Sequence, residues 1–169
     1  YAKRINGING RSEAYKAAAS ASATPWFFTV FAKLKIDNNF DFTWQPDRFQ
    51  QPKHYIFHAR SPVNDLEYGH MGLIVYNKDI TLNTQQTSIE LDFTLAALHE
   101  VIPVVSGTAN FNTDPLSTWR TAFREAIKLK HSVFTKQDTI AELRLRQWQI
   151  DANQAKNAEV FFFIMLSLL

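Results

Sequence analysis

The sequence predicts an α/β protein with a mixed, largely parallel sheet and flanking helices. Segments with a helical period, residues 12–22, 114–131 and 139–150, alternate with segments of strand period, residues 26–36, 55–59, 73–77 and 101–105. Such alternation is typical of sheets whose strands are joined through helices. The chain has 169 residues, 46% of them hydrophobic, which is enough to bury the core of one domain.

Composition narrows the classes of function. The net charge is +2, so we expect neither a nucleic-acid partner nor a membrane-binding basic face. The chain contains no Cys, which excludes disulfides and thiolate metal sites and suits a cytoplasmic protein. It begins at Tyr1 and not Met, so we expect an N-terminally truncated single domain over residues 1–157.

The last residues, 158–169, differ from the rest of the chain. Val160–Leu169 is apolar, but it is half of the roughly 20 residues needed to span a bilayer. We expect this tail to be either a buried terminal helix or a non-native end.

The strongest strand signal is Trp26–Ile36, which is dense in aromatic and β-branched residues. Its first half is apolar on both faces, which predicts a central strand with Phe28 and Val30 almost fully buried. Lys33 and Lys35 share one face near the end of the segment. Open α/β sheets usually bind ligands at that end of a strand, so both lysines are candidate substrate-binding residues.

A helix is expected before this strand. Residues 3–11 form a polar loop with two glycines, which is either an anion-binding loop or a turn that leads into the helix. Ser12 is a suitable N-cap, and the small Ala17–Ala18 face suits packing against a sheet. A later helix start is clearer, because Asp114 and Pro115 occupy typical N-cap and first-turn positions.

The segment from Gly7 to Val30, with its alanine-rich middle and hydrophobic end, resembles the nucleotide-sugar half of A-type glycosyltransferases. Residues 4 to about 130 are more closely similar to glycosyltransferase-like proteins of tailed marine phages. Four segments carry this closer resemblance: Trp44–Phe49, His54–Arg60, Leu66–His70 and Thr118–Glu125. The resemblance implies part of an A-type fold and, for a phage-encoded protein, a place in the host cytoplasm.

One departure from that family concerns its metal ligands. The family has Asp-x-Asp at the end of the strand, where this chain has Phe31-Ala32-Lys33. We therefore expect no metal and no cofactor there, with the lysines able to offset the charge of a diphosphate. Asp37 and Asp41 are either displaced metal ligands or solvated loop carboxylates.

A second group of candidates surrounds the polar loop 61–72. Glu67 and His70 are the best acid/base candidates, and the alternative is a structural loop. Arg60, Asn64 and Arg120 are further candidate substrate-binding residues. His54 and His58 share a strand face at a spacing that a metal could also use, although no third ligand is nearby in the sequence.

Two functions of different classes follow. The first is a glycosyltransferase that uses a nucleotide-sugar without the usual metal motif. The second is a catalytically inactive binding or structural module of a phage protein. The expected small-molecule partner is a nucleotide-sugar or nucleoside diphosphate in the first case.

Overall fold

The computed structural model describes residues 2–62, 65–85, 93–110, 114–130 and 142–146. The chain falls into two compact units, residues 1–59 with 67–107, and residues 60–66 with 108–169. The predicted single domain over residues 1–157 stays a prediction, and the apolar tail 158–169 lies outside the described residues.

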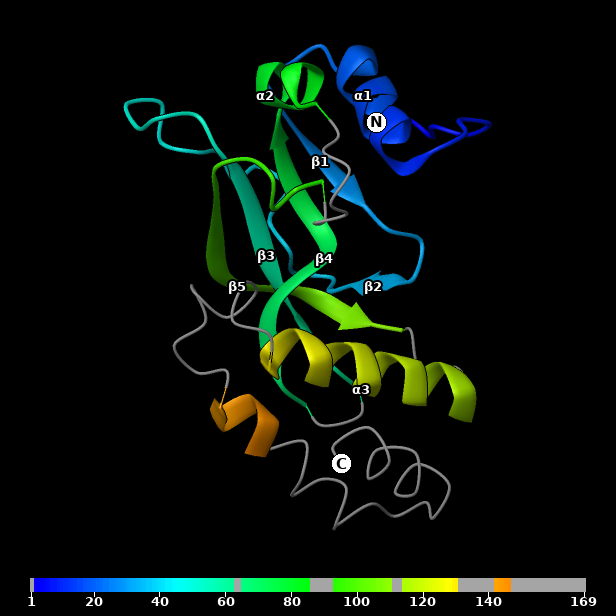
Figure 1. The fold of residues 1–169 in the computed structure, drawn as a ribbon. Coiled ribbons are helices and arrows are strands. Elements are labelled where there is room, and N and C mark those ends of the chain that lie inside the picture. Colours follow the sequence, from blue (N-terminus) through cyan, green and yellow to red (C-terminus); the bar gives the residue numbers. More distant parts are fainter. Residues whose placement is uncertain (1, 63–64, 86–92, 111–113, 131–141, 147–169) are drawn as a thin grey trace. The chain divides into compact units, whose positions relative to one another are not determined.

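The elements follow one another along the chain as Figure 1 shows. They are α1 (Arg11–Ala21), β1 (Trp26–Val30), β2 (Leu34–Ile36), β3 (His54–Arg60), β4 (Glu67–Asn77), α2 (Lys78–Asn83), β5 (His99–Ala109) and α3 (Pro115–Lys130). Residues 142–146 form a further helical turn. The unit boundaries fall inside β3, after Ala59, and inside β5, after Gly107.

The five strands form one sheet in the order β1-β4-β3-β5-β2. β1 pairs antiparallel with β4, with Trp26 opposite Asn77 and Val30 opposite Leu73. β1 and β2 stand at opposite ends of this order, yet only residues 31–33 separate them in the sequence. A sheet can satisfy both conditions only if it curls until its two ends approach each other, so it forms a mixed, nearly closed barrel.

The predicted fold class is therefore wrong. The sheet is not a largely parallel one with flanking helices, as an A-type glycosyltransferase fold would require. The prediction assumed that each helical segment joins two parallel strands. The chain contradicts this assumption, because β1 and β2, and then β2 and β3, follow each other without a helix in the described residues between them.

The segment 26–36 is also not one central strand. Leu34 donates its backbone N–H to the Phe31 carbonyl over 2.9 Å, so a turn divides the segment into β1 and β2. β1 stands at one end of the strand order, Phe28 is half-buried, and the Val30 side chain is 42% exposed. The apolar residues of β1 pack against aromatic rings on both faces. The apolar composition of β1 therefore does not require a layer of helices on each side.

The longest buried run is instead in β4, the neighbour of β1, whose residues 72–77 are all buried. The core of the first unit gathers around Ile74 and Tyr76 of β4, Ile56 of β3, Phe93 and Tyr15. Tyr15 reaches this core from α1, and its ring lies 5.0 Å from that of Tyr76 and 5.1 Å from that of Phe93. Aromatic pairs at such spacings stabilise a core beyond the area they bury.

The predicted position of helix α1 in the sequence agrees with the structure, but the predicted buried face of the helix is wrong. Its buried residues are Ser12, Tyr15 and Ala19, whereas Ala17 and Ala18 are only half-buried. The N-cap is Gly10 and not Ser12, because Ser12 is already the second residue of the helix. The large ring of Tyr15 decides which face of this weakly amphipathic helix turns inward, because it buries more apolar area than alanine methyl groups do.

The remaining local predictions have mixed outcomes. The start of α3 is confirmed, since Asp114 accepts hydrogen bonds from the Ser117 N–H at 2.9 Å and from its hydroxyl at 2.7 Å. Turns follow β2 in residues 38–43, and the short helix α2 follows β4 directly. Asn77 starts α2 by accepting the Ile80 N–H. Of the predicted helix 139–150, only residues 142–146 are described.

Candidate functional site

A hollow of about 470 Å³ lies beside the end of β2. Its walls are the turn after β2 and the middle of β5, and its lining residues are Asp37, Asn38, Asn39, Phe40, Asp41, Val104 and Val105. All of them belong to the first unit. The hollow brings two carboxylates and two amides together with an aromatic ring and two valines.

Backbone hydrogen bonds hold the two walls in place. Asp37 donates its N–H to the Ser106 carbonyl of β5 over 3.0 Å, and Phe40 donates to the Asp37 carbonyl over 3.0 Å. The Ser106 hydroxyl in turn donates to the His58 carbonyl of β3 over 2.8 Å. The turn is therefore attached to the rigid part of the barrel and is not a free loop.

Gly107 allows β5 to approach β2 closely. A methyl group at this position would lie 2.1 Å from the Lys35 carbonyl oxygen and 2.8 Å from the Ile36 Cα. Both contacts are with backbone atoms, so a side chain here would push the two strands apart. The shape of the hollow consequently depends on this glycine.

The carboxylate of Asp41 is held by its own turn. Its Oδ1 accepts the Thr43 backbone N–H at 2.7 Å and the Thr43 hydroxyl at 2.6 Å. These hydrogen bonds, the side-chain one foremost, lower the pKa of the exposed Asp41 carboxyl, since they favour its charged form. Both bonds end on Oδ1.

An aromatic cluster supports the floor of the hollow. The Phe40 ring lies 5.2 Å from Phe57 and 5.0 Å from Phe42, with edge-to-face geometry in both pairs. Phe57 is fully buried, whereas Phe42 is 48% exposed. Phe40 thus connects the core of the barrel with its surface.

The predicted residues of the first unit lie on other parts of it. Lys33 is in the turn between β1 and β2, Lys35 is on β2, and both are exposed. Glu67 and His70 are on β4, where a spacing of three directs side chains to opposite faces of a regular strand. His70 Nδ1 accepts the Gly72 N–H at 3.0 Å. The prediction that Glu67 and His70 act as acid and base stays a prediction.

The remaining predicted residues belong to the second unit or are not described. Arg60 ends β3, and Arg120 is exposed on α3. Asn64 lies outside the described residues. The predictions that these residues and the two lysines bind a substrate stay predictions.

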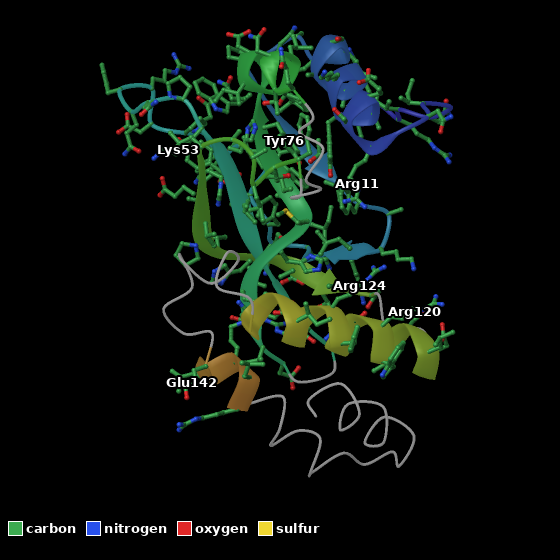
Figure 2. All side chains as sticks on the ribbon, in the orientation of Figure 1. Arg11, Lys53, Tyr76, Arg120, Arg124 and Glu142 are labelled. Carbon is green, nitrogen blue, oxygen red and sulfur yellow. The ribbon has the colours of Figure 1, made fainter. Side chains whose placement is uncertain are left out.

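His54 belongs to a buried polar network at the other end of β4. Its Nδ1 accepts the Asn77 N–H at 3.2 Å, and its ring meets the Tyr76 ring edge-on at 4.8 Å. Tyr76, labelled on β4 in Figure 2, shares a hydrogen bond of 2.5 Å with the Thr94 hydroxyl. Burial first, and the nearby His99 second, lower the pKa of His54 to about 4.

Two pairs of side chains were considered as metal ligands from the sequence, Asp37 with Asp41 and His54 with His58. The described residues contain no group of three or more His, Asp or Glu side chains that could hold an ion. His54 is buried and His58 is half-buried. Lys53, at the start of the same segment, pairs instead with Glu100 at 2.7 Å.

Comparisons with known proteins found no matching family model, no matching curated protein and no matching solved structure. Among the residues that the structure describes, no helix is long and apolar enough to cross a membrane.

The sequence indicated only one side of the hollow. Asp37 and Asp41 stood out as carboxylates, but nothing local pointed to Val104 and Val105 as the facing wall.

Proposed function

We propose that the first unit is a saccharide-binding module and that the hollow beside β2 is its binding site. The observation that carries the proposal is the mixed lining, in which paired carboxylates and amides stand beside an aromatic ring and two valines. The volume of about 470 Å³ is of the size that small-ligand sites usually have.

The chemistry of the lining favours a neutral polyol. Carboxylates accept hydrogen bonds from hydroxyl groups, and amides both donate and accept, so together they match a ligand with many hydroxyls. Val104, Val105 and Phe40 offer apolar surface to the C–H groups of a sugar ring. Asp37 and Asp41 would repel a phosphate at this distance, which argues against a diphosphate in the hollow.

A titration followed by two-dimensional NMR tests this proposal. We expect glucose or N-acetylglucosamine to shift the backbone signals of residues 37–41 and 104–105, and we expect uridine diphosphate not to shift them. Binding of the diphosphate alone would support the glycosyltransferase hypothesis instead. Failure of every probe would leave a structural module.

Asp41→Asn is the informative variant. It keeps an oxygen for the Thr43 bonds but replaces the acceptor Oδ2 with a donor, so sugar affinity should fall roughly fivefold to tenfold. Asp47→Asn is the matched control, because Asp47 accepts the Phe49 N–H in the same kind of turn at 2.9 Å and does not line the hollow. Equal losses in both variants would contradict the assignment of the site.

A further inference from the structure

The N-terminal loop contains two Asn-Gly pairs, Asn6-Gly7 and Asn9-Gly10. They lie just before Arg11, which begins α1 (Figure 2), and residues 2–11 are all exposed. The other three glycines of the chain follow Tyr68, Met71 and Ser106. Asparagine before glycine is therefore confined to this loop.

An Asn-Gly pair can undergo an intramolecular reaction between its own backbone and side chain. The backbone nitrogen of the glycine can attack the side-chain amide carbon of the asparagine, and a side chain on the second residue hinders this approach. Glycine offers no such hindrance and lets the backbone reach the required dihedral angles. A Cβ at position 7 would meet nothing within 4 Å, and one at position 10 would meet only the Glu13 Cγ, at 4.0 Å.

The hydrogen bonds of the loop leave the reacting groups available. Within the part of the chain that the structure describes, neither the two asparagine side chains nor the N–H groups of Gly7 and Gly10 form a hydrogen bond. Gly7 and Gly10 also have positive φ angles of 70° and 95°, outside any regular element. No regular structure has to open before the attack.

We propose that Asn6 and Asn9 are sites of spontaneous deamidation. A bond forms between the glycine nitrogen and the asparagine Cγ, and the amide group leaves as ammonia with the proton from the glycine N–H. Water then opens the resulting cyclic imide at one of its two carbonyls, which yields aspartate or isoaspartate. The net reaction consumes one water and releases one ammonia for each residue.

The modification changes the charge of a defined region. Each conversion adds one carboxylate, so two conversions lower the net charge of the chain from +2 to zero. Asn9 directly precedes Gly10, the N-cap of α1, which supplies no side-chain hydrogen bond. A carboxylate beside the free N–H groups of a helix start interacts favourably with them, so deamidation at Asn9 acts on α1.

The other asparagines of the described residues are each followed by a residue with a side chain, which hinders the attack. Asn39 precedes Phe40, whose side chain hinders attack, and Asn38 precedes Asn39. Asn77 is buried, and its Oδ1 accepts the Ile80 N–H at 3.0 Å. These residues serve as internal controls.

The test is incubation of the purified chain at mildly alkaline pH, followed by trypsin digestion and mass spectrometry. Both sites fall in one peptide, Ile5–Arg11, and the control residues Asn38 and Asn39 fall in Ile36–Arg48. We expect the first peptide to gain one and then two mass units while the second keeps its mass. Equal rates in the two peptides would overturn the proposal.

Two variants locate the reaction. Asn9→Gln should limit the gain of Ile5–Arg11 to one mass unit, and Gly10→Ala should slow conversion at Asn9 while Asn6 still reacts. Methylation of the product by an isoaspartate methyltransferase identifies the isoaspartate. A second mass unit in Asn9→Gln, or an unchanged rate at Asn9 in Gly10→Ala, would contradict the mechanism.

Discussion

Two polar regions of the first unit differ in what their polar groups contact. In the network around His54 and Tyr76, the side chains are buried, and the hydrogen bonds of His54 Nδ1 and the Tyr76 hydroxyl are with the backbone and with Thr94. In the hollow beside β2, Asn38, Asn39 and Asp41 are exposed, and the free side of each can bond to water or to a ligand. Buried polar groups therefore set the stability of the fold, whereas exposed polar groups that converge on one hollow are available for binding.

The largest difference in unfolding free energy is expected between variants of Phe57 and Phe42, two phenylalanines that contact Phe40. Phe57→Ala should lower the unfolding free energy by about 3–5 kcal/mol, because it leaves a cavity among Phe28, Phe40 and Trp44. Phe42→Ala should cost much less, since that ring is half exposed. Urea unfolding of the two variants measures both values, and equal costs would contradict the assignment of Phe57 to the core.

The next effect concerns pH and His54. The pKa of His54 is about 4 in the folded chain and about 6.5 when the chain is unfolded, so only the unfolded state takes up a proton between these values. Stability is therefore full above pH 6.5 and falls as the pH drops towards 4, by up to about 3 kcal/mol.

The variant His54→Gln keeps a side-chain acceptor for the Asn77 N–H but cannot titrate. Its unfolding free energy should depend less on pH between 4 and 6.5 than that of the wild type. Denaturant unfolding at several pH values measures this slope. An identical slope in both proteins would show that His54 is not the buried group responsible.

The smallest of the three effects is expected from Tyr76→Phe. The change removes one hydroxyl and leaves the buried Thr94 hydroxyl without the 2.5 Å hydrogen bond, which should cost about 1–3 kcal/mol. Sugar binding in the hollow should stay unchanged. A loss of binding without a loss of stability would reverse the proposed division between the two regions.

Elements whose signals are local could be predicted from the sequence. The start of α3 depends on Asp114 and Pro115, which act within one turn, and helix α1 was placed to within one residue. The apolar run Leu73–Asn77 was recognised as a strand because its composition alone distinguishes it.

The closure of these elements into a barrel could not be predicted in this way, because it depends on pairing between distant segments. The aromatic composition of residues 26–36 predicted one buried central strand. The position of β1 is set instead by its pairing with β4 and by the turn at residues 31–33, which ends the strand. The hollow depends on contacts between Lys35 and Gly107, and between Asp37 and Ser106, which are about 70 residues apart. Pairing over such distances is set by the register of whole strands, and no local pattern in either segment specifies its partner.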